Sequence, residues 1–486
     1  MLLAAVLLPV LSGALLPLFR FSSGRKRAIY VECVTVLTSM LTLAAVWFRD
    51  GRPWVLFEVV KGLPVALFCD GAAAVFAVLV SLMWPFAALY AFSYMEHEER
   101  PDRFFAWYTI AYGVTLGLAF SANLLTLYIF YECLTMATLP LVNHKDDPAS
   151  RKAGLKYAAW TIGGAALGFV ALIFSIQYGD PSLFRVGGSL TGAAGHEQLL
   201  RWIYLLGFVG FGTKAAVAPT SGWLPTASVA PTPVTALLHA VAVVNAGAYA
   251  VLRLTRDVFG TQLLAGTFAR TAVLALACFT VLLGAVMAVR EQHLKRRLAW
   301  STVSNLSYML MGIALMTDEG FTGALAHLVF HGVMKIVLFF CAGAILVRTG
   351  REYVQDLRGL HRQMPLTCAA FTLAGAAMLG VPPLCGFVSK WQLLTAAAAT
   401  QTPMGYVAIG TILLAAVLTG VYLFGPVTAM YFRPLAAEYA QDPQMKKDPD
   451  DRMLIPIFVF CAAMLVLGLA SEPVVAWLSG AASGLL

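Results

Sequence analysis

Three ionisable residues recur every four positions in the apolar stretch GALAHLVFHGVMKIVLFFCAGAIL, residues 323–346: His327, His331 and Lys335. Positions i, i+4 and i+8 of an α-helix lie on one face, so the three side chains share one environment. The stretch is long enough to cross a bilayer, and an ionisable group facing lipid costs about 3 kcal/mol on insertion scales. We therefore expect the stripe to face protein or a water-filled cavity and to transfer protons.

A metal site is the competing chemistry for this stripe, because two histidines at i and i+4 are also spaced as in helical zinc motifs. Leu328 and Val329 lie between the histidines, so the glutamate base is missing, and Lys335 stands where a third ligand would be needed. The sequence thus predicts no metal here. It contains no G-x-S-x-G nucleophile motif either.

Four further ionisable residues, Glu132, Lys214, His239 and Lys390, lie in other apolar segments. Glu132, in LLTLYIFYECLTMATLPL, is the one carboxylate that we place deep within a span, and Lys214 is its expected partner. A proton arriving on one member weakens their attraction, so the pair can act as a switch; the alternative is a static buried ion pair. His239 is either a relay, since histidine exchanges protons near neutral pH, or a hydrogen-bonded core residue.

The elements that carry these residues are membrane helices. Of the 486 residues, 60% are hydrophobic and 12% are charged, which excludes an ordinary soluble surface and predicts an all-α polytopic membrane protein. We count fourteen apolar segments of spanning length, beginning near residues 2, 28, 70, 104, 123, 154, 199, 232, 270, 299, 321, 367, 405 and 453. The first has no basic residue before its apolar run, so we expect it to be a retained helix and not a cleaved signal peptide.

The net charge of +8 is explained by the loops and not by a nucleic-acid partner. With the N-terminus outside, loops after odd-numbered helices hold 21 of the 33 basic residues and the opposite loops hold 8, among them Arg253 and Arg256. Basic loops face the cytoplasm, so both termini are expected outside and the loop containing QMKKDPDDR inside. The remaining four, Lys156, Lys214, Lys335 and Lys390, lie in or beside apolar segments.

Two segments combine helix breakers with a lysine. In GFGTKAAVAPTSGWLPTASVAPTPV, Lys214 precedes four prolines, and in LGVPPLCGFVSKWQLL, Pro382 and Pro383 precede Lys390. Proline removes a backbone donor, so both helices, the seventh and the twelfth, are expected to be broken near mid-membrane and to line a wet cavity; simple proline kinks are the alternative. Because an offset of five helices reverses orientation, the pair predicts an inverted repeat of helices 4–8 and 9–13.

The eight cysteines are scattered, with no C-x-x-C pair, so neither disulfides nor an iron–sulfur site is expected in this chain. Any redox cofactor must then belong to a partner. The expected division is residues 1–103 for helices 1–3, 104–254 for the first repeat, 255–432 for the second, and 433–486 for a cytoplasmic loop and helix 14.

The segments GTKAAVAPTSGWLPTASVAPTPVTALLHAVAVVNAGAY, HLKRRLAWSTVSNLSYMLMG, HLVFHGVMKIVLFFCAG and DLRGLHRQMPLTCAAFTLAGAAMLGVPPLCGFVSKWQLL together resemble the antiporter-like membrane subunits of respiratory complex I, energy-converting membrane-bound hydrogenases and Mrp cation/proton antiporters. The resemblance covers roughly residues 70–430. It implies a fourteen-helix core, two inverted five-helix repeats and a lateral file of charged residues that carries protons.

Matched position by position, the resemblance assigns that file to Glu132, Lys214, His239, His327, His331, Lys335 and Lys390, with Lys390 at its end. One position departs from the pattern: Asn245 stands where some relatives carry lysine. An amide cannot change charge, so the centre of the file is expected to depend on His239 or on water. The chain also ends soon after its fourteenth span, without the lateral helix of the longest relatives, which suggests a shorter member.

The resemblance implies a proton-translocating subunit of a larger complex in a prokaryotic inner membrane, in contact with lipid, other hydrophobic subunits and, in a redox-driven complex, peripheral subunits with Fe–S or nickel centres. The alternative is an Mrp-type subunit that exchanges sodium or another cation for protons without redox chemistry. A carbon-uptake complex is a third setting. A purely structural scaffold is disfavoured, since it gains nothing from the desolvation of seven ionisable groups.

Overall fold

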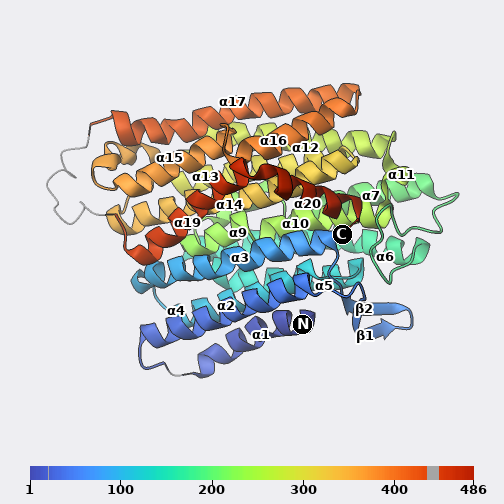
Figure 1. Cartoon of the computed structure of the whole chain (residues 1–486), viewed down its shortest axis with the longest axis horizontal. Coiled ribbons are helices and arrows are strands. Elements are labelled where there is room, and N and C mark those ends of the chain that lie inside the picture. Colours follow the sequence, from blue (N-terminus) through green and yellow to red (C-terminus); the bar gives the residue numbers. More distant parts are fainter. Residues whose placement is uncertain (20, 435–447, 486) are drawn as a thin grey trace.

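The computed structural model describes residues 1–19, 21–434 and 448–485, except for the side chains of His97, Leu238 and His239. The long helices run side by side, and both termini lie towards the end of the molecule that carries a small β-hairpin (Figure 1). Much of the loop expected in the cytoplasm, including Lys446 and Lys447, lies outside the described residues.

The first half of the chain supplies the helices that surround Glu132 and Lys214. They are α1 (Leu2–Leu15), α2 (Gly24–Trp47), α3 (Gly71–Tyr94), α4 (Pro101–Ala119), α5 (Leu124–Val142), α6 (Pro148–Tyr178), α7 (Glu197–Gly212), α8 (Trp223–Ala227), α9 (Thr232–Ala240) and α10 (Val243–Leu252). A π-helical segment, η4 (Arg253–Phe259), continues α10.

The second half supplies the helices around the histidine stripe. They are α11 (Thr261–Leu264), α12 (Phe268–Arg290), α13 (Leu294–Ala314), α14 (Asp318–Thr349), α15 (Pro365–Leu379), α16 (Cys385–Ala399), α17 (Pro403–Phe432), α19 (Asp451–Leu469) and α20 (Ser471–Ser483). Each of the fourteen starting points predicted from the sequence lies near the start of a helix in one half of the chain or the other. Within the described residues, eight helices are long and apolar enough to cross a membrane: α2, α3, α5, α6, α12, α14, α17 and α19. The prediction of a mostly helical, polytopic membrane protein is thus confirmed.

Local signals in the sequence set the helix starts. Asn123 begins α5 by accepting a hydrogen bond from the Thr126 backbone N–H, and Asp147 begins α6 in the same way. Thr317 caps α14 through the N–H of Gly320. These side chains satisfy backbone donors that have no partner within the helix, which fixes where each helix begins.

Both predicted breaks are present. The chain leaves the helical path between α7 and α8, immediately after Gly212, and again between α15 and α16 at residues 380–384. A third interruption separates α9 from α10 at Val241 and Ala242, and no proline or glycine marks it. The side chain of Asn245 compensates for this third break, because its amide donates to the free Ala240 carbonyl at 2.9 Å.

The expectation of an all-α fold missed one element. Strands β1 (Trp54–Val60) and β2 (Leu63–Leu67) form an antiparallel hairpin that turns at Lys61 and Gly62. The segment WVLFEVV is rich in β-branched and aromatic residues, which favour strands, and Gly62 adopts a positive φ of 85° in the two-residue turn. β2 is anchored to the bundle by a hydrogen bond from the Ala122 N–H to the Ala66 carbonyl.

Arg253 and Arg256 do not lie in a loop, as the sequence interpretation placed them. Both are buried in η4, where Arg253 donates to Asp70 at 2.5 and 2.6 Å and to Asp257 at 2.8 Å. Burial of Asp70 raises its pKa, but the charge and hydrogen bonds of Arg253 outweigh burial and hold this pKa at about 2. Because Asp70 also caps α3, the cluster joins the start of α3 to the end of α10.

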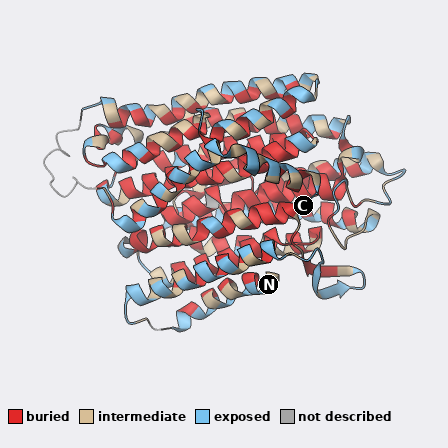
Figure 2. Cartoon of the chain, viewed as in Figure 1, coloured by how far each residue is buried: buried red, intermediate tan, exposed pale blue. Residues whose placement is uncertain are grey.

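The buried core is centred on α14. The helices in the middle of the bundle are almost wholly buried, whereas those at its edges, such as α17 and α2, alternate buried and exposed residues (Figure 2). α14 packs against α9, α13, α15, α16 and α3. In an apolar stretch of 18 residues of this helix, 94% of the residues are buried inside the protein. The stripe therefore lies on a helix that this chain itself shields from lipid.

Candidate functional site

The α14 stripe is fully buried. His327, His331 and Lys335 have no exposed surface, although each carries a polar group that must be satisfied or solvated inside the protein. The rings of His327 and His331 are nearly parallel, with centroids 5.8 Å apart. The stripe predicted from the spacing therefore faces protein, as expected.

At one end of the stripe, His327 contacts two other helices. Its Nδ1 lies 3.0 Å from the Ser389 hydroxyl on α16, and its ring centroid lies 5.4 Å from that of Tyr308 on α13. Its Nε2 is buried without a hydrogen-bond partner among the described residues. One nitrogen is thus held by α16, while the other makes no hydrogen bond to the described part of the chain.

At the other end, Lys335 donates to the Ser301 hydroxyl and, at 3.3 Å, to the Leu298 carbonyl, both on α13. No salt bridge holds this lysine within the described residues. Its ammonium is thus bound by neutral oxygen atoms of α13.

Lys390 lies on α16, just after the second break. Its Nζ donates to the carbonyls of Met378 and Leu379 at 2.8 and 3.1 Å, which are the last carbonyls of α15. The same Nζ lies 5.6 Å from the ring centroid of Tyr308, the residue that also contacts His327. Tyr308 and Ser389 thus join Lys390 to the stripe on α14.

Lys214 lies in the first break, directly after α7. Its ammonium donates to the Tyr131 carbonyl on α5 and sits 3.5 Å from the centroid of the Tyr131 ring. The Tyr131 hydroxyl in turn donates to the Phe211 carbonyl at 2.9 Å, at the end of α7. The break is therefore fixed against α5 at the residue that precedes Glu132.

Glu132 is half-buried, and its Oε1 has no hydrogen-bond partner among the described residues. The carboxylate and the Lys214 ammonium are close enough for their charges to interact, but no salt bridge joins these two described side chains. The expected partners are thus brought together, with Lys214 bound to a carbonyl and the Glu132 carboxylate left available.

The centre of the predicted file of ionisable residues lies beside the third break, between α9 and α10. The side chain of His239 lies outside the described residues, so only its place on α9 is known. α14 approaches the break closely, because a Cβ added to Gly332 would lie 3.1 Å from the Ala240 carbonyl. On the other side, Gly247 of α10 packs directly against Lys214. The break between α9 and α10 therefore lies between Lys214 on one side and Gly332, the residue after His331, on the other.

The groups on α13 were not singled out from the sequence. Ser301, Asn305 and Tyr308 lie at i, i+4 and i+7 on this helix, and all three are buried. That spacing in AWSTVSNLSYMLMG is itself a polar stripe and could have identified them.

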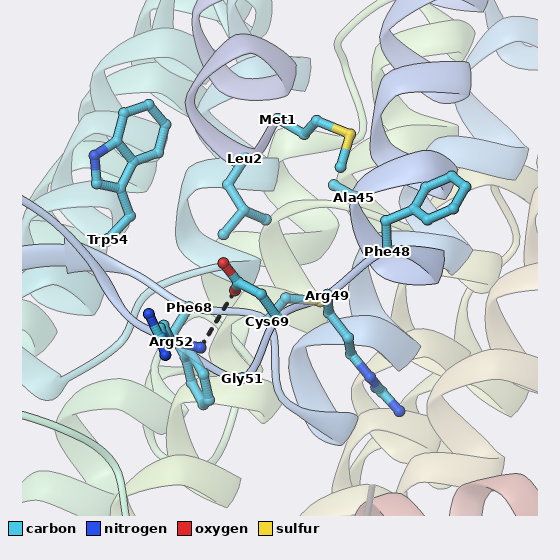
Figure 3. Close-up of a pocket in the computed structure, with 11 residues that line it drawn as sticks. Met1, Leu2, Ala45, Phe48, Arg49, Gly51, Arg52, Trp54, Phe68 and Cys69 are labelled. Atoms are coloured by element: carbon cyan, nitrogen blue, oxygen red, sulfur yellow. Dashed lines mark hydrogen bonds between the residues drawn. The ribbon is translucent and has the colours of Figure 1, made fainter.

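A cavity of about 150 Å³ at the hairpin end of the molecule contains none of these residues. It is bounded by Met1, Leu2, Phe48, Trp54 and Cys69, and near it the Asp50 carboxylate accepts a hydrogen bond from the Arg52 backbone N–H at 3.2 Å (Figure 3). Within the described residues, no three His, Cys, Asp or Glu side chains cluster to hold a metal, and the eight cysteines are unpaired.

Comparison with known protein families shows to which family the chain belongs. The model of the family described as NADH:quinone oxidoreductase/Mrp antiporter, transmembrane, matches residues 121–419, which include all seven residues of the predicted file. The chain belongs to this antiporter family. The resemblance read from the sequence is therefore confirmed.

Named relatives of the antiporter family come from two kinds of complex. The NADH-quinone oxidoreductase subunit N of Desulforudis audaxviator is 30% identical over 473 residues, covering 92% of this chain and 91% of the relative. A Rhizobium meliloti protein named as a probable K(+)/H(+) antiporter subunit is 30% identical over 478 residues, covering 96% of this chain but only 47% of the relative.

Solved structures share the antiporter-family fold. A chain of the archaeal membrane-bound sulfane sulfur reductase superposes with a TM-score of 0.86 at 21% identity, covering 99% of this chain and 97% of the other. A chain of the Mrp complex from Dietzia sp. DQ12-45-1b gives a TM-score of 0.87 at 24% identity, covering 99% of this chain and 52% of the other.

Proposed function

We propose that this chain is a proton-translocating, antiporter-like subunit of a multisubunit complex in a prokaryotic plasma membrane. The observation that carries the proposal is the succession of ionisable side chains through the middle of the bundle, from Glu132 and Lys214 to the α14 stripe and Lys390. In the described part of the chain, the lysines there are bound to carbonyls and hydroxyls and not to carboxylates. Each can therefore release a proton without breaking a buried salt bridge.

Glu132 and Lys214 form the switch at the first break. When the carboxylate is ionised, it attracts the Lys214 ammonium; when it takes a proton, the attraction falls and Lys214 relaxes onto the Tyr131 carbonyl, where it is freer to pass its proton inward. His239 and water between α9 and α10 continue the path past Asn245, which can hydrogen-bond to water but cannot carry charge.

The stripe on α14 forms the second half of the path. Side chains one helical turn apart are separated by roughly 6 Å along the axis, a gap that one bridging water closes. The sequence of groups is Lys335, His331 and His327, then Ser389 and Tyr308, and finally Lys390. The lysine at the end lies on the second broken helix, where the exit is proposed.

We further propose that the bundle has fourteen spans arranged as two inverted repeats, residues 104–254 and 255–432, flanked by residues 1–103 and 433–486. The supporting feature is that each proposed repeat has a break with a lysine whose ammonium binds a backbone carbonyl on a neighbouring helix segment. Both termini are assigned to the outside, on the basis of the loop charges.

The driving reaction separates two settings. In a redox-driven complex, partner subunits supply Fe–S or nickel centres; in a cation antiporter, the partners are hydrophobic subunits only. The first is favoured by the relative that this chain covers almost completely, which belongs to an NADH-quinone oxidoreductase. The second is favoured by the relative named for K(+)/H(+) antiport.

Purification of the intact complex in mild detergent distinguishes the two settings. Iron, acid-labile sulfide or nickel in stoichiometric amounts is expected for the redox-driven complex. Hydrophobic partners alone, with cation-dependent proton flux in proteoliposomes, would instead assign the chain to an antiporter. Absence of proton flux under both an electron donor and a cation gradient would contradict the proposed function itself.

A further inference from the structure

α15, the half-helix that precedes the second break, has no cap of its own. Its N-cap residue is Met364, whose side chain has no oxygen atom and makes no capping hydrogen bond. The Met364 N–H donates to the Leu360 carbonyl at 2.9 Å, and Pro365, the first helical residue, has no N–H. The backbone donors of Leu366 and Thr367 are therefore the ones for which the first turn of α15 offers no acceptor.

Asp448 supplies both acceptors from a distant part of the chain. This residue lies between α17 and α19, and its carboxylate accepts hydrogen bonds from the Leu366 N–H at 3.1 Å and the Thr367 N–H at 2.9 Å. The Thr367 hydroxyl donates to the same carboxylate at 2.7 Å. A carboxylate suits this place, because the N-terminus of a helix carries a partial positive charge. Three hydrogen bonds thus fix the start of α15 to a residue 81 positions after Thr367.

The other end of α15 holds Lys390. The Lys390 ammonium donates to the carbonyls of Met378 and Leu379 at 2.8 and 3.1 Å. α15 has 15 residues, so at 1.5 Å per residue it is about 22 Å long. Asp448 is therefore too far from Lys390 to contact it and can influence it only through the helix between them.

The second break makes the axial position of α15 independent of α16. The chain leaves α15 at Gly380, which has a positive φ of 97°, and helical structure resumes only at Cys385. No continuous helix therefore transmits the position of α16 to α15. A displacement of α15 by about 1 Å away from Lys390 would lengthen both carbonyl hydrogen bonds beyond the usual limit of about 3.2 Å.

We propose that Asp448 is a positioning residue for proton exit: it fixes the axial position of α15 and so places the Met378 and Leu379 carbonyls at Lys390. This inference rests on the proposed role of Lys390 in transport. It assigns the positioning of the exit to a residue outside both proposed repeats. The competing explanation is a local cap, in which Asp448 stabilises only the first turn of α15 while packing positions the other end.

Proton flux into proteoliposomes that contain the intact complex tests the effect on transport. Asp448→Ala removes all three hydrogen bonds and is expected to lower initial flux roughly tenfold or more, because a misplacement of about 1 Å can cost about 10²-fold in rate. Asp448→Glu keeps the charge and both acceptor oxygens and should retain most of the flux. Asp450→Asn is the matched control, since it removes the same charge two residues further on, where the carboxylate pairs with Arg452 at 2.7 Å. It should transport like the wild type.

A double-mutant cycle in thermal stability distinguishes positioning from local capping. The Tm of the purified complex is measured for wild type, Asp448→Ala, Lys390→Met and the double variant. Residues this far apart normally contribute independently to stability. If Asp448 positions the carbonyls, they have already moved away from Lys390 in Asp448→Ala. The further fall in Tm caused by Lys390→Met should then be about half, or less, of the fall that it causes in the wild type.

The outcomes separate this inference from the proposed function. Wild-type flux in Asp448→Ala, or additive changes in Tm, would make Asp448 a local cap and overturn the positioning role, while the proposed path stays intact. If Asp448→Ala does not assemble, Asp448→Asn, which keeps one acceptor oxygen, takes its place in both experiments with the same expected directions. Absence of flux in every complex, wild type included, is a failure of the proposed function. The thermal cycle does not depend on transport and still decides whether Asp448 positions the carbonyls at Lys390.

Discussion

Lys390 has a structural role and a proposed role in proton transport, and substitutions can separate the two. Its ammonium satisfies the last two carbonyls of α15, at 2.8 and 3.1 Å, and it is the proposed final proton carrier. Lys390→Met leaves both carbonyls without a donor in a buried site. Each unsatisfied carbonyl costs about 1–3 kcal/mol of folding stability, so the two together cost about 2–6 kcal/mol. Part of this cost is offset, because the variant no longer has to bury a desolvated ammonium.

Lys390→Arg keeps donors and charge but cannot release a proton at physiological pH. We therefore expect Lys390→Met to lower both the thermal stability of the purified complex and its proton flux. Lys390→Arg should restore much of the stability but none of the flux. The assays are thermal unfolding followed by tryptophan fluorescence and pH-dye quenching in proteoliposomes.

The two variants separate the structural role of Lys390 from its proposed role in proton release, because Lys390→Arg is expected to restore stability without restoring flux. If Lys390→Arg transports protons at the wild-type rate, a change of protonation at this position is unnecessary, and the reasoning about the exit is refuted. Lys390 would then be a structural cap on α15.

Three other predictions concern the Glu132–Lys214 pair, the orientation in the membrane and the Asp70–Arg253 ion pair. Lys214→Ala and Glu132→Ala should each strongly reduce proton flux while the complex still assembles on a native gel; wild-type flux in both would make the pair structural. A cysteine placed in the loop QMKKDPDDR should react with an impermeant reagent only from the cytoplasmic side, and the opposite result would reverse the assigned orientation. Asp70→Asn should destabilise the fold by about 1.5–3 kcal/mol, because the buried Arg253 loses its charge-assisted hydrogen bonds to Asp70 and keeps Asp257 as its carboxylate partner. Asp180→Asn, at a partly exposed pair with Arg185, should cost about 1 kcal/mol or less. The difference between wild type and Asp70→Asn should shrink as the pH falls from about 4 towards 2, since protonation of Asp70 then removes its contribution.

The helices and two of the breaks could be predicted because their causes are local. Spanning length follows from hydropathy, and Pro382 and Pro383 remove backbone donors wherever they occur. The interruption between α9 and α10 has no such signal. It is stabilised by the Asn245 amide and by the close approach of α14 at Gly332, and both depend on tertiary packing.

Candidate site residues were predictable by type, but their partners were not. Spacing alone indicated that His327, His331 and Lys335 share a face. It could not show that Lys214 binds the Tyr131 carbonyl in place of the Glu132 carboxylate, since one turn of α5 offers both acceptors. The burial of Arg253 was missed for a similar reason: its counter-ion Asp70 is 183 positions away in the sequence.

Lys335 tests the central claim most directly, because it is fully buried in the middle of the proposed path and its ammonium is bound by Leu298 and Ser301 of α13. The measurement is initial proton flux into proteoliposomes that contain the intact complex with Lys335→Met, compared with wild type at equal amounts of assembled complex. The proposed path predicts that flux is abolished. Flux at the wild-type rate would show that protons do not pass along the α14 stripe.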